Sequence, residues 1–411
     1  MTSLEHHEPA RAHFDLENVV RLLRSGMRTA VFGIVPVAGL IVTLWVERRG
    51  IAYDMHHAFR PAAEAVLNGR SPYPTPTLDA LATRTAWVYL PFASFLFLPF
   101  ALVPPLAADL ISMALVAAAG AAALWVLGIR DGRCFGIALL TMPVLSGIQT
   151  ANLTLPLALA LAGVWATRSR RFVPGLLLAL TLATKLFLWP VLVWFVATRR
   201  YRGAACAVAG TVLLVVGGWA ALGFAGAREY PEILRLLSVA LERDSYTPFA
   251  LARDLHASEH IARAIGLGLA SAVLVGCWIY GRRGDDVRSF TLAIVASLLF
   301  TPIVWLHYFA LLFVPVAIVQ RRLSPLWSLP LVLWLFAEGH GNGSTAQTAF
   351  VLLAFATLVT LTLRAAARGA AEDEGYDAFG VIRAKMRKFG WPSGSSKNSG
   401  LTQPSSPVRL S

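Results

Sequence analysis

The chain has 411 residues, of which 56% are apolar and only 14% are charged. A soluble domain carries about 25% charged residues, so this composition excludes an ordinary soluble enzyme and predicts that most of the chain lies in lipid. Lys and Arg number 36 against 23 Asp and Glu, and they are scattered through short loops, which argues against nucleic acid as a partner. In a membrane protein such an excess is typical of loops that stay in the cytoplasm, near anionic lipid.

The apolar runs are repeatedly closed by pairs of arginines, which is a pattern of helical membrane proteins rather than of barrels. We therefore expect an all-α polytopic membrane protein with about 11–13 transmembrane or re-entrant helices. The three cysteines, Cys134, Cys206 and Cys277, stand singly inside apolar runs. They predict packing rather than a disulfide framework.

Taken in chain order, the charged segments predict a topology. The first apolar run, 30–46, has no small-residue cleavage site after it, so we expect a signal anchor. Arginines precede it, which predicts a cytoplasmic N-terminal segment over 1–28 and an outer loop over 48–87. A membrane domain over 29–366 and a cytoplasmic, disordered basic tail over 367–411 complete the expected organisation. The later basic clusters, interpreted as cytoplasmic, are Arg168, Arg170 and Arg171; Arg199, Arg200 and Arg202; Arg282, Arg283 and Arg288; Arg321 and Arg322; and Arg364 and Arg368.

The first outer loop opens on a carboxylate, Asp54, at the point where the chain leaves the membrane. Apolar residues then recur at helical spacing from Phe59 to Leu67, which predicts a short amphipathic helix suited to a membrane surface. Gly69 is expected to end this helix, before a turn at Ser71-Pro72-Tyr73. A carboxylate in this position is either a solvated interfacial group or a functional one.

The next part of the chain, 87–152, allows two topologies. Apolar runs over 88–103 and 107–127 are each long enough to span, and 135–147 is then expected to be a half-helix that enters from outside. This interpretation leaves the basic loop 130–133 on the outer side, against the charge rule. In the alternative, that loop is cytoplasmic and 88–103 is re-entrant. Both place the polar segment 147–152 outside.

Between two basic clusters lies a segment, 172–198, that is too short for two ordinary crossings. It has about 26 residues, whereas one crossing needs about 20. We expect a hairpin of two short helices, broken near Lys185 and Pro190. The remaining outer turns are then expected at 228–260, 301–308 and 338–343, so that the polar residues gather on the side of Asp54.

In this arrangement the sequence resembles the GT-C superfamily of glycosyltransferases that use polyprenyl-phosphate sugars. Within it, the chain is similar to family 87, the bacterial mannosyl- and arabinofuranosyltransferases. The likeness covers about 30–364. It depends on six elements: Asp54 at the start of the first outer loop, the Gly-Arg-Ser-Pro-Tyr turn (Gly69–Tyr73), Tyr89-x-Pro91, Gly147-x-Gln149-x-x-Asn152, Lys185 at a helix break, and Trp305-x-His307-Tyr308.

The resemblance implies an inverting transfer on the outer face of the membrane. Asp54 would remove the proton from an acceptor hydroxyl, which requires an ionised carboxylate within reach of that oxygen. Lys185 and His307 would bind the departing phosphate, because a lysine inside an apolar run is costly unless it has a function. The residues expected to bind substrate are Arg70, Tyr73, Tyr89, Gln149, Asn152, Trp305 and Tyr308.

Structural alternatives to these roles stay open at this point. In these alternatives, the Lys185 side chain reaches the membrane–water interface with its ammonium group. His307, Gln149 and Asn152 form hydrogen bonds between helices. No cofactor is expected. In Asp54-Met55-His56-His57, adjacent residues point in different directions on a helix and no second carboxylate is near in sequence, so no metal site is predicted there either.

The partners that the resemblance implies are a polyprenyl-phosphate sugar donor and a glycolipid or glycan acceptor, together with membrane lipids. Mannose is the expected sugar of the donor. An arabinofuranosyltransferase is the near alternative. A transporter or flippase for a lipid-linked sugar is the alternative from another class, since it would share the broken helices and Lys185. Inverted repeats, which would favour a transporter, are not evident in the sequence.

Overall fold

A computed structural model describes residues 26–27, 30–46, 48–82, 86–336 and 344–369. Helices are the regular structure throughout this described part, and about 77% of the described residues are helical, which confirms an all-α polytopic fold. The chain divides into two compact units, Met1–Glu374 and Gly375–Ser411. The second unit, the arginines before the first apolar run (Arg21, Arg24 and Arg28) and the turn expected at 338–343 lie outside the described residues, so the prediction for each is untested.

Within the described residues, four helices are long and apolar enough to cross a membrane. They are α7 (Pro105–Val126), α13 (Tyr201–Ala221), α16 (Glu259–Arg282) and α20 (Thr345–Gly369). A bent pair, α9 (Met142–Gln149) and α10 (Thr154–Ala166), turns by 116° and could form one more crossing. The shorter apolar segments are η1–α2 (Ala30–Ile34, Val35–Val46), α11 (Val173–Thr184), η4–α12 (Leu186–Leu188, Pro190–Ala197), η5–α18 (Leu306–Leu312, Phe313–Val319) and α19–η6 (Pro325–Ser328, Leu329–Phe336).

The short segments α11 and α12 form the expected hairpin. Arg168, before α11, and Arg200, after α12, both bind the carboxylate of Asp286, at 3.3 and 2.7 Å. Asp286 begins α17 (Asp286–Phe300), so the starts of α11 and α17 and the end of α12 meet at one carboxylate. The chain therefore goes out and back between Arg168 and Arg200, and the prediction of a broken hairpin is confirmed. We call this end of the helices the basic end.

The loop 130–133 also lies at the basic end. Asp131 accepts a hydrogen bond from the backbone N–H of Leu323 at 3.1 Å, which puts this loop beside Arg321 and Arg322. Segment 88–103 does not span: it consists of α5 (Pro91–Leu96) and α6 (Leu98–Ala101). Segment 88–103 thus contains no helix of crossing length, which contradicts the preferred topology of the sequence analysis; the side of the membrane on which loop 130–133 lies stays a prediction. Proline stands at the start of α5 (Pro91), in the first turn of α6 (Pro99) and just before α7 (Pro104), and an apolar run that is long enough to cross is thereby divided into short helices.

The first outer loop forms a π-helical turn, η3 (Met55–Phe59), that continues as α3 (Arg60–Leu67) and ends before Gly69 (φ +66°). Most of the apolar face of this helix packs on the protein, whereas the expectation was a helix suited to a membrane surface. Phe59 is fully buried and stacks on Phe97 with ring centroids 4.3 Å apart. It also meets Trp87 and Tyr89 edge-on. The loop is thus fixed on the protein, which gives Asp54 a rigid support.

The long loop 228–260 packs on the same end as the first loop. Its helix α14 (Tyr230–Leu241) buries Ile233 and Leu236 against Leu81 of α4 (Leu78–Ala82). After α14 the chain pairs with the segment that precedes η5: Tyr246 donates its backbone N–H to Val304 at 2.9 Å. The short helix α15 (Pro248–Asp254) then leads into α16.

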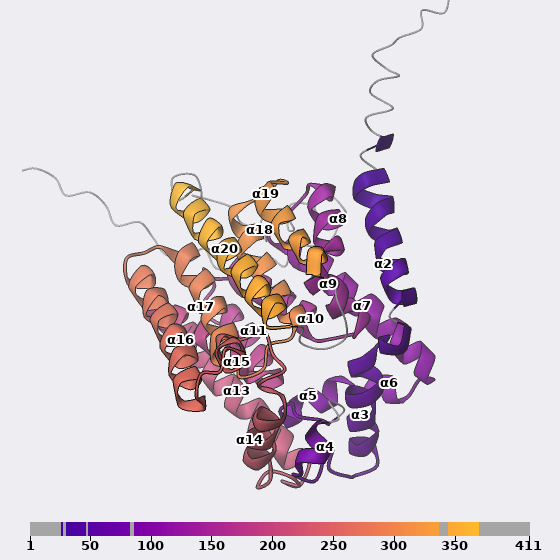
Figure 1. The fold of residues 1–411 in the computed structure, drawn as a ribbon. Coiled ribbons are helices and arrows are strands. Elements are labelled where there is room, and N and C mark those ends of the chain that lie inside the picture. The colour runs from indigo at the N-terminus through magenta and orange to yellow at the C-terminus, as the bar shows by residue number, and fades with distance from the viewer. Residues whose placement is uncertain (1–25, 28–29, 47, 83–85, 337–343, 370–411) are drawn as a thin grey trace, which may run out of the picture. The chain divides into compact units, whose positions relative to one another are not determined.

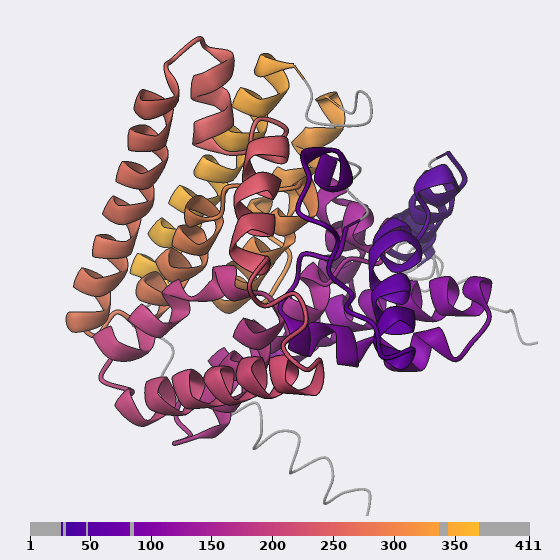
Figure 2. The ribbon, with the colours of Figure 1, turned by 90° about the horizontal axis from the view of Figure 1, so that it is seen from below.

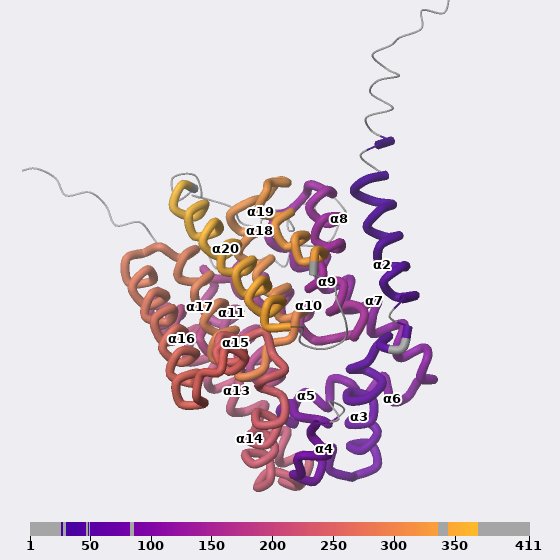
Figure 3. The backbone as a smooth tube through the Cα atoms, viewed as in Figure 1, coloured from indigo at the N-terminus to yellow at the C-terminus, as the bar shows by residue number. Residues whose placement is uncertain are grey.

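In Figure 1, α3, α4 and α14 lie together at the lower end of the helices, whereas α8 (Gly132–Leu140) and α19 lie at the upper end. In Figure 2, which is viewed from below, α2 and α16 lie on opposite sides of the other helices, as they do in Figure 1. The backbone tube of Figure 3 follows the same course.

Candidate functional site

Asp54 lies against the end of α9, although about 100 residues separate them in sequence. The Nδ2 of Asn152 donates to Oδ2 of Asp54. The direction of this amide is fixed from its other end, because Asn152 Oδ1 accepts from the backbone N–H and the hydroxyl of Thr154, at 3.0 and 2.7 Å. An amide whose oxygen is so occupied must present its N–H₂ to the carboxylate.

Two backbone hydrogen bonds hold the segment of Asp54 to the end of α9. The N–H of Ala52 donates to the carbonyl of Gln149 at 2.6 Å, and the N–H of Asp54 to that of Thr150 at 3.0 Å. Between Thr150 and Asn152 stands Ala151, which has a left-handed backbone (φ +54°), and Ala52 has one as well (φ +49°). The carboxylate is thus fixed through backbone as well as side-chain contacts.

Lys185 stands at the break of the α11–α12 hairpin. Its backbone is extended (φ −149°, ψ 104°), and Lys185 thereby separates α11 from η4. The ammonium donates to the hydroxyl of Tyr308 and lies 4.0 Å from the centroid of that ring. The rings of Tyr89 and Phe187 follow at 5.1 and 5.7 Å. Aromatic faces stabilise a cation in a place with little water.

The carboxylate and the ammonium act on each other electrostatically. Burial raises the pKa of Asp54, which lies in the loop between spans, whereas the Asn152 amide and the Lys185 charge act in the opposite direction. The hydroxyl of Tyr89 lies near both Asp54 and the Asn152 side chain. An acid, an amide, an ammonium and two phenols therefore form one cluster, which we call the polar cluster (Asp54, Tyr89, Asn152, Lys185, Tyr308).

His307 lies at the margin of the polar cluster. It is buried in η5 next to Tyr308, with the two ring centroids 5.0 Å apart, and it interacts electrostatically with Lys185. Its Nε2 is buried without a hydrogen-bond partner among the described residues. Since a buried polar atom without a partner is unfavourable, this nitrogen is suited to a ligand atom.

Not every residue expected to bind substrate joins the polar cluster. Tyr73 supports it from behind, because its hydroxyl donates to the carbonyl of Tyr89 at 2.9 Å and its ring stacks on Trp219. Gln149 meets the first outer loop through Gly50 and Ala52. Arg70 is exposed beyond α3. Trp305 contributes its carbonyl, which accepts from the N–H of Tyr308 at 3.0 Å.

The structure adds two residues that the sequence analysis did not select. Thr154 orients the Asn152 amide, and the ring of Phe187 stacks on Tyr308 at 5.5 Å beside the ammonium. Asn-x-Thr at the start of a helix is a recognisable capping pattern and was a usable signal for Thr154. Phe187 has no comparable signal, since aromatic residues are frequent in membrane helices.

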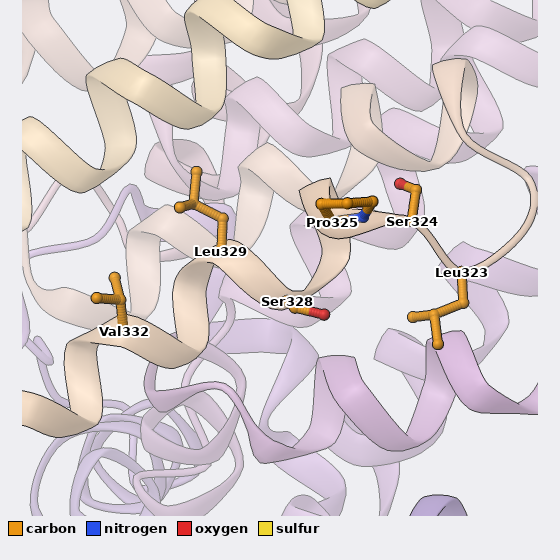
Figure 4. Close-up of a pocket in the computed structure, with 6 residues that line it drawn as sticks. All are labelled: Leu323, Ser324, Pro325, Ser328, Leu329 and Val332. Atoms are coloured by element: carbon orange, nitrogen blue, oxygen red, sulfur yellow. The ribbon is translucent and has the colours of Figure 1, made fainter.

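A separate open groove of about 610 Å³ runs along α19 and η6 at the basic end (Figure 4). Its lining residues are Leu323, Ser324, Pro325, Ser328, Leu329 and Val332. None of them belongs to the polar cluster, so this groove is not part of the candidate site. The described residues also contain no group of three or more His, Cys, Asp or Glu side chains that could hold a metal ion.

Comparison with known families gives a match to glycosyltransferase family 87 over residues 87–306, more than half of the chain. The chain belongs to glycosyltransferase family 87. This confirms the resemblance inferred from the sequence, and the all-α fold is consistent with the GT-C superfamily. Neither the curated proteins nor the solved structures gave a match.

The family 87 match includes much of the polar cluster but not all of it. Tyr89, Asn152 and Lys185 lie inside the matched range. Asp54 precedes the range, and Tyr308 lies two residues beyond its end. Asp54 is therefore tied to the matched region by its contacts with Asn152 and with the end of α9.

Proposed function

We propose that this family 87 glycosyltransferase transfers mannose from polyprenyl phosphate to a glycolipid or polysaccharide acceptor at the outer face of the membrane. The observation that carries the proposal is the polar cluster, in which a carboxylate and an ammonium come together from distant parts of the chain. Transfer from a lipid phosphate needs one group that accepts a proton and one that stabilises a leaving phosphate. The proposal assigns no cofactor and no metal ion to the reaction.

In the proposed step, Asp54 takes the proton of an acceptor hydroxyl. The acceptor oxygen forms a bond to the anomeric carbon as the bond from that carbon to the phosphate oxygen breaks, and the configuration inverts. The electron pair leaves with the phosphate, which gains one negative charge as polyprenyl phosphate. A single base is sufficient, because phosphate is a good leaving group without protonation.

Lys185 is the group that we assign to the developing phosphate charge. Its ammonium is held mainly by aromatic rings and by one hydroxyl, so a phosphate oxygen would be a stronger partner than those it has. The buried Nε2 of His307 has no partner among the residues described, and we assign it to a second phosphate oxygen. Asn152 keeps Asp54 oriented, and Tyr89 and Tyr308 line the space between base and cation.

Support for a site at the outer face comes from charge. The carboxylate Asp286 binds arginines of two clusters at the basic end, whereas Lys185 lies at the other end of α11, about 18 Å away along a 12-residue helix. If the arginine clusters face the cytoplasm, as the charge rule predicts, the polar cluster opens toward the opposite side.

The proposal is tested with purified enzyme in lipid and a labelled polyprenyl-phosphate mannose. We expect wild type to transfer the label and Asp54→Asn to lose at least about 1,000-fold in kcat while it still binds the donor. Lys185→Met should lower kcat by about 100-fold or more, and Lys185→Arg should recover part of this loss.

The matched control is Arg235→Met, which removes an exposed cation of α14 and should leave the rate unchanged. Transfer of arabinofuranose but not of mannose would reject the sugar. Movement of the donor across the membrane by wild type, without transfer, would reject the enzyme in favour of a carrier.

A further inference from the structure

Two residues beside the proposed base have a backbone conformation that L-amino acids avoid. Ala52 and Ala151 both lie in the left-handed region, at φ +49° and +54°. Both are buried. In this region the Cβ of any residue other than glycine approaches the backbone too closely, so alanine accepts it only where the surroundings impose it.

At Ala151 the left-handed residue is part of the motif that ends α9. The N–H of Asn152 donates to the carbonyl of Gly147 at 2.9 Å, and that of Ala151 to Ile148 at 3.0 Å. These are the two bonds of a Schellman motif, with Ala151 in the place that glycine usually takes. The left-handed residue turns the chain sharply, so that Asn152 points back across the end of the helix toward Asp54.

At Ala52 the left-handed residue turns the chain on the opposite side of the same contact. Its N–H donates to Gln149, and its carbonyl accepts from the N–H of His56 at 2.8 Å as η3 begins. The two left-handed alanines therefore lie on either side of the backbone bonds that join 52–54 to 149–150. Each sits within two residues of one member of the Asp54–Asn152 pair.

We propose that Ala52 and Ala151 are positioning residues, whose paired left-handed turns direct Asp54 and Asn152 at each other and hold the base toward the acceptor. This inference rests on the proposed function, because it assumes that Asp54 is the base. The role belongs to the backbone conformation and not to the methyl groups. Residues that accept positive φ should therefore replace alanine, and β-branched residues should not.

The first test measures transfer kinetics. Ala52→Gly and Ala151→Gly should keep kcat within about threefold of wild type, whereas Ala151→Val should lower kcat by about 100-fold, because a shift of about 1 Å at the reacting groups has an effect of that size. The donor KM should stay the same. The acid limb of the pH–rate profile should move to higher pH in Ala151→Val, since the Asn152 amide would no longer stabilise the carboxylate.

Valine at a buried position could also prevent folding, so a second variant inserts one glycine after Ala151. The insertion adds no side chain, displaces Asn152, and should give the same loss of kcat and the same shift of the acid limb. The matched control is His256, a left-handed residue (φ +64°) that follows α15, is exposed, and does not belong to the polar cluster. His256→Val and a glycine inserted after His256 should leave kcat and the acid limb unchanged.

A cross-link measures the geometry without using activity. In a chain with Cys134, Cys206 and Cys277 replaced by alanine, Asp54→Cys with Asn152→Cys removes the side-chain contact, so only the backbone aligns the two thiols. A short bis-methanethiosulfonate should join them with alanine or glycine at position 151, and should fail with valine or with the inserted glycine.

Normal kcat and an unmoved acid limb in folded Ala151→Val and in the insertion variant would overturn the inference, as would equal cross-linking in every chain. A wild type without transfer activity would overturn the proposed function instead. The cross-link yields would still decide whether the two alanines set the geometry.

Discussion

Asp54 is surrounded by groups that act on its charge in opposite directions. Burial favours the neutral acid, whereas the Asn152 amide and the Lys185 ammonium favour the carboxylate. Burial is the largest of these effects, so the pKa of Asp54 is raised above its ordinary value. A raised pKa gives a stronger base, and the carboxylate stays in the active form only where the pH exceeds that pKa.

The pH dependence follows from this balance. Activity should be present above the pKa of Asp54 and lost as the pH falls through it, and this acid limb should lie above the ordinary carboxyl value of about 3.9. Asn152→Ala removes a donor that stabilises the charged form, so the acid limb should move to still higher pH. Initial rates of sugar transfer at saturating donor, measured across the acid range, check both statements; an acid limb that stays in place in Asn152→Ala would contradict them.

Single residues were predictable where their chemistry conflicts with their surroundings. Asp54 and Lys185 stand out in the sequence because charges beside or inside apolar runs are unfavourable without a function. Arg70 was selected from its place in a turn, and it lies exposed, outside the polar cluster. Ala52 and Ala151 had no signal at all, since alanine does not mark a left-handed conformation in the way that glycine or asparagine does.

At the scale of elements, the α11–α12 hairpin is closed at its base by one carboxylate. Asp286 accepts two hydrogen bonds from Arg200 and one from the indole of Trp194, each at 2.7 Å, and pairs with Arg168. Trp194 belongs to α12 and Asp286 to α17, whereas Arg168 follows α10 and Arg200 lies between α12 and α13. This contact therefore fixes the hairpin whose tip carries Lys185.

Removal of this carboxylate should weaken the fold. We expect Asp286→Asn to lower the free energy of unfolding by about 1–3 kcal/mol, because two half-buried arginines lose a charged partner. Thermal melting of the purified protein in detergent measures this. Glu232→Gln, which breaks an exposed pair with Arg235 on α14, should leave the melting temperature unchanged. Equal melting temperatures for the two variants would contradict the assigned role of Asp286.

The hairpin was predictable and segment 88–103 was not, for related physical reasons. Segment 172–198 is bounded by arginines on both sides, so its length alone required a break. Segment 88–103 is long enough to cross, and the charge rule at loop 130–133 argued against that crossing but was outweighed by the length of the run. The decisive contact is the hydrogen bond from the backbone N–H of Leu323 to Asp131, which joins residues 192 positions apart. No local sequence pattern predicts such a contact.

For the whole molecule, the two ends of the helices differ in chemistry. Arginines of several loops gather at the basic end, around Asp286 and Asp131. The polar cluster and the two long polar loops occupy the other end. This separation was predicted from the order of charges along the chain, and the contacts confirm it for the loops that the structure describes.

Accessible thiols would relate these ends to the membrane. In a chain without its native cysteines, Asn68→Cys in the first outer loop should react with a membrane-impermeant maleimide on intact cells, and Ser169→Cys beside Arg168 should react only after permeabilisation. Both positions are exposed in the folded protein. The opposite pattern would place the polar cluster on the cytoplasmic side, and labelling of both from one side would reject the topology.

The shared carboxylate at the basic end also has a consequence for biosynthesis. Asp286 follows Arg200 by 86 residues, so the hairpin emerges from the ribosome well before the group that joins its two ends. Each of its helices is shorter than one bilayer crossing. The contacts of Asp286 with Arg168 and Arg200 can form only after the start of α17 has been synthesised, so the hairpin is closed at its base late in the synthesis of the chain.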